Sequence, residues 1–162
     1  LYSKQFIDVT ELIYWASLGM FFKAASWSIS YVFIAKGASK LFFWNELITN
    51  VYLLGFNLLG YYFMGLRGLG LSFTVSYFLY LIQVYIISHK KFNFSFDKEF
   101  LKIFTVQFSI AILSFFCTSF LRQPFSYIIG LVLISFSSYY SFMELDRRLN
   151  LKETIMKIKN KF

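Results

Sequence analysis

A lysine in the middle of an apolar stretch is the residue of this chain best suited to chemistry. Lys23 lies near the centre of residues 11–35, which are mostly apolar. At the centre of a membrane helix a lysine costs roughly 2.5 to 3.5 kcal/mol, and each strongly apolar residue returns only about 0.3 to 0.6 kcal/mol. Such a helix is marginal alone and needs polar partners or a water-filled cavity around Lys23. That need is typical of a transport pathway.

Polar side chains also gather on single faces of the apolar stretches. In residues 11–35 the sequence predicts a small and polar stripe and an apolar back that lies away from it. The stripe consists of Ala16, Gly19, Lys23, Ser26 and Ser30, and the back of Leu18, Phe22, Ile29, Val32 and Phe33. In residues 40–64 one face carries Asn45, Glu46, Thr49, Asn50 and Asn57. Gln83 shares a weaker face with Ser72 and Ser76. We predict that Lys23, Asn45, Glu46, Asn50, Asn57 and Gln83 line a substrate pathway.

Each of these residues also has a purely structural interpretation, and the sequence leaves both open. Lys23 can pair with a carboxylate and only hold helices together. The Asn and Ser faces can form hydrogen bonds between helices. Glu46 can pair with Lys40, and Lys36 and Lys40 can serve only as orientation anchors near the end of a span.

The chain lacks the residue pairs that catalysis needs. Its single histidine and single cysteine, His89 and Cys117, are far apart and do not form a nucleophile–base pair. No HExxH, CxxC or phosphate-binding glycine motif is present. The GLRGLG stretch at residues 65–70 joins two apolar stretches and lacks the strand–turn–helix context of a dinucleotide site. We therefore expect no enzyme, no cofactor and no metal site.

The composition predicts an all-α membrane protein of several spans. Of 162 residues 58% are hydrophobic, with 23 Phe and 12 Tyr, and the apolar runs approach 20 residues. We expect five membrane helices, at residues 11–35, 40–64, 70–88, 98–120 and 124–143, and a basic amphipathic tail at 144–162. Asp8 or Thr10 is expected to cap the first helix, Gly37 to close it, and the glycines of residues 65–70 to reverse the chain.

The basic residues predict an orientation. Of the 16 Lys and Arg residues, twelve fall on one side of the five predicted spans and three on the other, and the remaining one is Lys23. The three are Lys4, Arg67 and Arg122. The positive-inside rule then places the C-terminus in the cytoplasm and residue 1 outside. The net charge of +8 comes from basic residues that lie between and after the apolar spans, where orientation signals are expected. We therefore exclude nucleic acid as a partner.

With these features in order, the chain resembles the O-antigen translocases, which are lipid-linked oligosaccharide flippases of the multidrug/oligosaccharidyl-lipid/polysaccharide (MOP) exporter superfamily. The resemblance covers roughly residues 1–95 and rests on the order and spacing of short motifs. They are Leu1-Tyr2-Ser3 with Phe6, GMFFK at 19–23, Ser26-Trp27, AKGASK at 35–40, Glu46, Asn50 and GLRGLG at 65–70.

The resemblance implies a fold and an activity. Similar proteins have 12 or 14 spans in two lobes around a central cavity, so the five helices would be spans ten to fourteen. The chain, which begins at Leu1, is then expected to be the C-terminal part of a longer protein. Residues 1–95 would be the flippase helices, 96–143 two additional spans, and 144–162 a cytoplasmic tail.

The implied substrate is an undecaprenyl-pyrophosphate-linked oligosaccharide, moved across the bacterial inner membrane. Its phosphates would contact Lys23 within the membrane, and Lys36 and Lys40 at the cytoplasmic face. The implied partners are this lipid-linked oligosaccharide, membrane lipid and other polysaccharide assembly proteins. A cation-coupled multidrug exporter of the same superfamily is the alternative. A membrane polysaccharide polymerase or ligase is a weaker one, because the outer loops near Arg67 and Arg122 are short.

Overall fold

The computed structural model of the chain describes residues 5–120 and 125–149, and the side chains of residues 9–118 and 125–148. The described part is helical, with four helices: α1 (Gln5–Ala35), α2 (Ser39–Phe92), α3 (Lys98–Phe120) and α4 (Phe125–Leu149). The expected all-α class is confirmed. The chain divides into two compact units, Leu1–Lys98 and Glu99–Phe162, so α1 and α2 belong to the first unit.

The end of α1 is closed by a glycine, as predicted. Gly37 has φ +71°, a left-handed conformation that a residue without a Cβ adopts easily. The Ala38 N–H donates to the Phe33 carbonyl at 2.8 Å, and the Gly37 N–H donates to the Ile34 carbonyl at 2.9 Å. This pair of bonds is a Schellman motif, and it satisfies carbonyls that the helix end would otherwise leave free. The helix starts at Gln5, so the predicted caps Asp8 and Thr10 lie inside it and are wrong.

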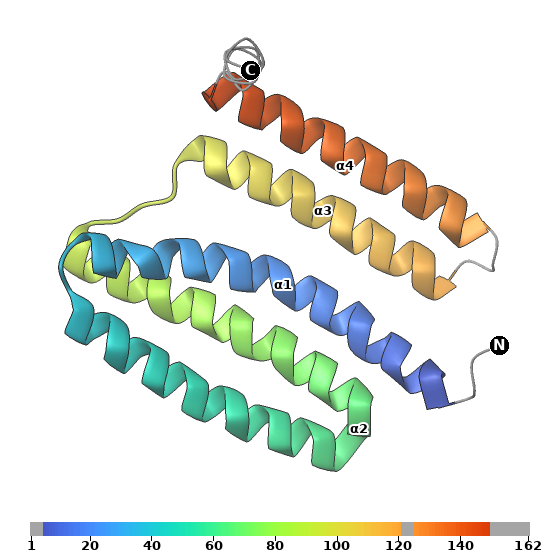
Figure 1. Cartoon of the computed structure of the whole chain (residues 1–162), viewed down its shortest axis with the longest axis horizontal. Coiled ribbons are helices and arrows are strands. Elements are labelled where there is room, and N and C mark those ends of the chain that lie inside the picture. Colours follow the sequence, from blue (N-terminus) through green and yellow to red (C-terminus); the bar gives the residue numbers. More distant parts are fainter. Residues whose placement is uncertain (1–4, 121–124, 150–162) are drawn as a thin grey trace, which may run out of the picture. The chain divides into compact units, whose positions relative to one another are not determined.

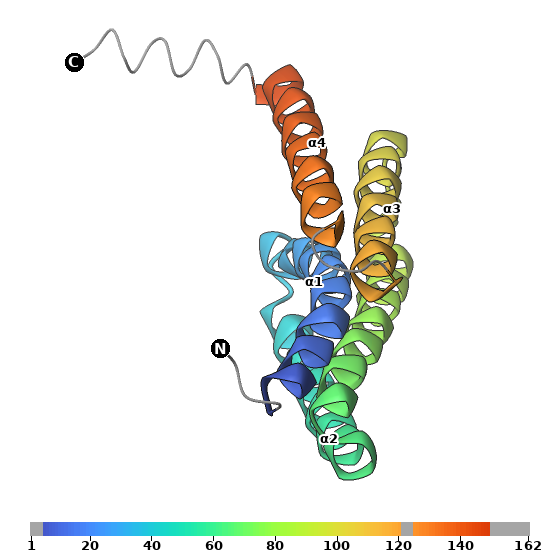
Figure 2. The same cartoon turned by 90° about the vertical axis from the view of Figure 1, so that its right-hand side faces the viewer.

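The 54-residue helix α2 turns back on itself at Gly65. Gly65 has φ +60° and ψ −140°, outside the helical region, and Figures 1 and 2 show the chain reversing there. We call residues 39–64 the first arm of α2 and residues 66–92 the second arm. The hydroxyl of Ser72 donates to Asn57 Oδ1 at 2.8 Å, which joins the arms near the turn. A Cβ on Gly60 would lie 2.6 Å from the carbonyl oxygen of Gly68, so the glycines let the backbones touch.

The expected count of five helices therefore differs from the four of the described residues. The helices predicted at 40–64 and 70–88 correspond to the two arms of α2, which only the non-helical Gly65 separates, because residues 66–69 are helical instead of forming a loop. A straight helix of this length would measure about 80 Å at 1.5 Å per residue, far more than the ~30 Å of a bilayer core. The reversal is what makes the length of α2 compatible with a membrane.

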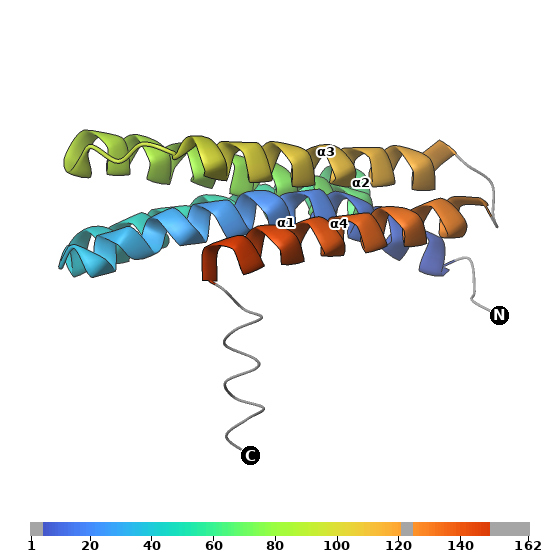
Figure 3. The same cartoon turned by 90° about the horizontal axis from the view of Figure 1, so that it is seen from above.

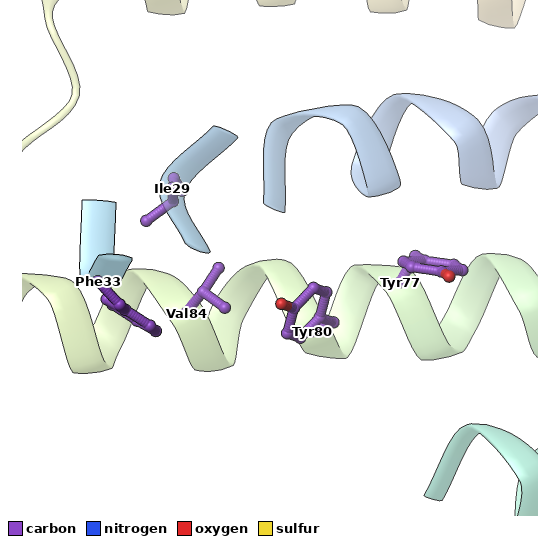
Figure 4. Packing of buried hydrophobic residues seen from close by; sticks show 5 residues of the cluster. All are labelled: Ile29, Phe33, Tyr77, Tyr80 and Val84. Carbon is purple, nitrogen blue, oxygen red and sulfur yellow. The ribbon is translucent and has the colours of Figure 1, made fainter. Parts of the chain in front are cut away.

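The core of the first unit lies between α1 and the second arm of α2. It consists of Ile29 and Phe33 from α1 and Tyr77, Tyr80 and Val84 from α2 (Figure 4). Phe33, Tyr80 and Val84 have no exposed surface. The prediction that Ile29 and Phe33 belong to a back turned away from the polar stripe is wrong, because these residues pack in the core beside the buried Ser26 and Ser30.

The second unit consists of α3 and α4, which run antiparallel (Figure 3). Gln107 of α3 donates to the Ser141 hydroxyl at 2.7 Å and accepts from the Ser137 hydroxyl at 2.6 Å. At one end Glu99 contacts Arg147 and Arg148 at 3.5 and 3.1 Å. Pro124 and most of the predicted basic tail lie outside the described residues.

Each of the four helices is long and apolar enough to cross a membrane. The apolar segments are Val9–Ala35, Ser39–Phe92, Lys98–Thr118 and Phe125–Arg148. Their outer surfaces carry large apolar side chains. In the first arm of α2, Val51, Leu54, Leu58 and Tyr62 are 60% to 81% exposed. A surface of this kind suits a hydrocarbon environment, in which such side chains remain exposed at no cost.

Candidate functional site

The carboxylate of Glu46 forms a ring of hydrogen-bonded oxygen atoms with two hydroxyl groups. The Ser30 hydroxyl of α1 donates to Glu46 Oε1 at 3.0 Å, and the Tyr80 hydroxyl of the second arm donates to the same oxygen. The Tyr80 and Ser30 hydroxyl oxygens are themselves 3.0 Å apart. Three segments of the chain therefore meet at one half-buried carboxylate.

A second group of polar side chains continues from this ring. Asn45, only 3% exposed, donates through Nδ2 to the Tyr80 hydroxyl at 3.4 Å. Its Oδ1 accepts from Gln83 Nε2 at 2.7 Å, and Gln83 also reaches the Thr49 hydroxyl at 3.4 Å. We call Ser30, Asn45, Glu46, Thr49, Tyr80 and Gln83 the Glu46 network. Because buried polar groups are costly unless they are hydrogen-bonded, this network also holds the two arms and α1 in register.

The other two predicted amides lie outside the network. Asn50 is exposed, and its Nδ2 donates to the backbone carbonyl of Glu46 at 2.9 Å. Asn57 is half-buried near the Gly65 turn and accepts from Ser72. Three of the predicted pathway residues, Asn45, Glu46 and Gln83, are therefore brought together, whereas Asn50 and Asn57 are not.

Lys23 lies in an aromatic environment. Its Nζ atom is 4.8 Å from the ring centroid of Trp27, 5.2 Å from that of Tyr77 and 5.7 Å from that of Phe73. Each ring is within the ~6 Å over which an aromatic face attracts a cation. We call these three rings the Lys23 cage. Among the ion pairs of the described residues, none includes Lys23.

Two helical pairs build the Lys23 cage. Lys23 and Trp27 are four residues apart on α1, and Phe73 and Tyr77 are four residues apart on the second arm, so each pair shares a face. The elements approach closely because residue 19 is a glycine. A Cβ at Gly19 would lie 2.6 Å from Cδ1 of Phe73 and 3.0 Å from Cα of Thr74. Any side chain at position 19 would therefore push the Phe73 ring away from its place beside Lys23.

The basic residues of the first unit are unevenly divided between its ends. The end of α1 and both ends of α2 lie together at one end, with Lys36, Lys40, Lys90 and Lys91 (Figure 1). Lys36 and Lys40 are exposed there. At the opposite end Arg67 pairs with Glu11 at 3.4 Å. The first end thus carries several positive charges, whereas at the second end Glu11 balances the charge of Arg67.

Several residues of the site are aromatic and were not singled out by their sequence. Trp27 entered only as part of a short motif, and Tyr80, Phe73 and Tyr77 were among the aromatics of the apolar stretches. One signal was available: Ser76, Tyr80 and Gln83 fall at i, i+4 and i+7, which places Tyr80 on the polar face of its helix.

The chemistry available at the site is binding and charge compensation. Among the residues whose placement is described, no group of three His, Cys, Asp or Glu side chains is arranged to hold a metal ion. The side chains that are present donate and accept hydrogen bonds, and one of them carries a positive charge near the middle of a long apolar helix.

Comparison of the chain with family models, curated proteins and solved structures finds no match.

Proposed function

We propose that the chain forms part of a membrane transporter that moves an anionic amphiphile, an undecaprenyl-pyrophosphate-linked oligosaccharide, across the bacterial inner membrane. The proposal covers transport without chemical change of the substrate. It rests on the resemblance to the O-antigen translocases. Those proteins have up to 14 spans in two lobes, and this chain would supply spans ten to fourteen.

The observation that carries the proposal is the environment of Lys23. In hydrocarbon an ionised ammonium group is stable only with compensation, and a carboxylate partner would be the strongest form of it. Lys23 instead lies against three aromatic faces, which attract the cation without neutralising its charge. A positive charge is therefore available to a pyrophosphate, whose loss of hydration is the main barrier to crossing.

The orientation follows from the distribution of charge. We propose that α2 crosses the membrane twice, once per arm, which with α1, α3 and α4 gives five crossings. The end of the first unit with Lys36, Lys40, Lys90 and Lys91 then lies in the cytoplasm, as does the C-terminus. Lys36 and Lys40 are exposed there and suited to a first contact with the phosphates.

A second candidate function is supported by a different observation. Glu46 is a carboxylate within an apolar helix that accepts two hydroxyl hydrogen bonds. A carboxylate of this kind suits the binding of protons or cations, which is what a cation-coupled exporter of the same superfamily needs. Lys23 argues against a cationic substrate, so the flippase remains the preferred function.

Replacement of Lys23 tests the proposal. We expect Lys23→Ala to abolish movement of the lipid-linked oligosaccharide in proteoliposomes, with the protein present at its normal level in the membrane. Lys23→Arg should retain part of the activity because the charge persists. Lys36→Ala, which removes a charge from an exposed position, should cause a much smaller loss.

Two results would contradict this role. Normal transport by Lys23→Ala would show that the charge is not needed. Restoration of transport only by a second, compensating charge change elsewhere in the protein would show that Lys23 is one half of a structural ion pair.

A further inference from the structure

The Lys23 cage has the composition of a binding site for organic cations. Proteins that recognise ammonium ligands surround them with aromatic faces, and three rings within about 6 Å of one nitrogen match this arrangement. Here the cation is part of the protein. The rings of the cage belong to Trp27 of α1 and to Phe73 and Tyr77 of the second arm of α2.

The cage has a buried wall and an open side. Tyr77 is 9% exposed and belongs to the core, whereas Trp27 is 45% exposed. The Phe73 and Tyr77 rings lie 4.7 Å apart, so that wall is continuous. The Lys23 side chain is itself half-buried, so the open side of the cage is the side of Trp27.

A tethered ligand blocks a free one of the same kind. Because the ammonium group is attached to the chain that forms the cage, its effective concentration there is on the order of millimolar or higher, and a free cation must compete with it. The unmodified cage is thus closed to cationic ligands by its own lysine.

We infer that the Lys23 cage is an alkylammonium-binding site that Lys23 itself fills, and that this occupancy makes the unit reject small organic cations. When the side chain is shortened, the three rings should accept a free primary alkylammonium ion. The binding claim does not depend on the identity of the transported molecule.

The test uses n-propylammonium, which replaces the atoms that Lys23→Ala removes. The 162-residue chain has three Trp residues, so Trp15→Phe and Trp44→Phe leave Trp27 as its only fluorescent indole. In this background we expect n-propylammonium to produce a saturable change in Trp27 fluorescence in the Lys23→Ala protein, with an affinity at least tenfold higher than with Lys23 present. n-Propanol, of similar shape and uncharged, should give no comparable change.

Two further variants make the test specific. Lys23→Met, which fills the cage with a neutral side chain of similar length, should not bind the ammonium ion. Addition of Trp27→Ala to Lys23→Ala, followed by calorimetry, should weaken binding severalfold because one of the three rings is lost. Lys23→Ser serves in place of Lys23→Ala if the latter does not reach the membrane.

The inference is overturned if neither the Ala nor the Ser variant binds n-propylammonium saturably. It is equally overturned if the unaltered protein binds as tightly as the variants, or if propanol binds as well as the ammonium ion. Failure of oligosaccharide transport in the Lys23→Arg protein, by contrast, bears on the proposed function and leaves the binding result unaffected.

Discussion

Glu46 and Lys23 carry opposite charges in the apolar segments of one unit, and these two described residues do not pair with each other. The Glu46 carboxylate accepts from two hydroxyl groups, whereas the Lys23 ammonium group lies near three aromatic rings. The pairing of Glu46 with Lys40, one of the structural alternatives, is not formed either, since Lys40 is exposed and Glu46 accepts from Ser30 and Tyr80. The two charged groups can therefore be tested independently.

Glu46→Gln separates the two candidate functions. A glutamine keeps the Oε1 acceptor for Ser30 and Tyr80, so the network and the amount of folded protein should be preserved. If the chain is a flippase for an anionic substrate, transport of the lipid-linked oligosaccharide should fall by less than about tenfold, which corresponds to roughly 1.4 kcal/mol in the transition state. Glu46→Leu is the contrasting change, because it removes the acceptor and should lower the level of folded protein.

Complete loss of transport in Glu46→Gln at a normal protein level would contradict this expectation. It would assign an ionisable role to the carboxyl group and favour a cation-coupled mechanism. Transport in proteoliposomes, with and without an imposed proton gradient, distinguishes the outcomes.

At the scale of elements, the reversal of α2 depends on one residue. Gly65 has φ +60° and ψ −140°, a conformation that residues with a Cβ adopt only under strain. Apart from the adjoining residues of the chain, no atom lies within 4 Å of a Cβ built at this position, so a substitution there tests backbone strain alone. Gly55, in the helical first arm, also has open space around it and is the matched control.

Gly65→Ala should lower the free energy of unfolding by on the order of 1 to 3 kcal/mol, the cost of a strained backbone conformation. Gly55→Ala should leave stability unchanged or raise it by about 0.5 to 1 kcal/mol, because alanine favours a helix. Reversible unfolding in mixed detergent micelles measures both. Equal effects of the two substitutions would show that the turn does not depend on Gly65.

The sequence predicts the turns of the first unit well. Gly37 and Gly65 were both expected to end or reverse helices, and their positive φ angles agree. Helix bounds were less accurate, because α1 and the second arm of α2 continue through polar residues that resemble caps and loops. An apolar pattern does not show where a helix resumes when only Gly65 is non-helical and residues 66–70, with Gly68 and Gly70, are helical.

The sequence predicts only part of the site, and the reason is physical. Polar residues within an apolar helix are conspicuous, so Asn45, Glu46 and Gln83 were identified and do lie together. An aromatic residue in a membrane helix looks the same in sequence whether it faces lipid or a neighbouring helix. Tyr80, fully buried, and Tyr77, at 9% exposed, are cases that only packing distinguishes. Ile29 and Phe33 were misplaced because the buried face of α1 is wider than its polar stripe.

At the scale of the whole molecule, the features that the proposed transport requires lie in the first unit. It combines an exposed apolar surface for lipid, a positive end, an internal polar network and a cation near the middle of α1. The second unit is held by Gln107 with Ser137 and Ser141 and by the Glu99 pairs at its end. Among its described residues 99–118 and 125–148, no cation lies deep within an apolar helix. The proposed transport chemistry is therefore assigned to the first unit.

The access of water to position 23 tests the central claim most directly. With Cys117, the only cysteine, replaced by serine, the Lys23→Cys protein is treated with the anionic reagent 2-sulfonatoethyl methanethiosulfonate, and Leu54→Cys serves as the lipid-facing control. Leu54 is 60% exposed on the outer side of the first arm. We expect the thiol of the Lys23→Cys protein to react and the thiol of the Leu54→Cys protein to remain unmodified. An unreactive thiol at position 23, or equal modification of the two thiols, would contradict the claim that Lys23 faces the pathway of an anionic substrate.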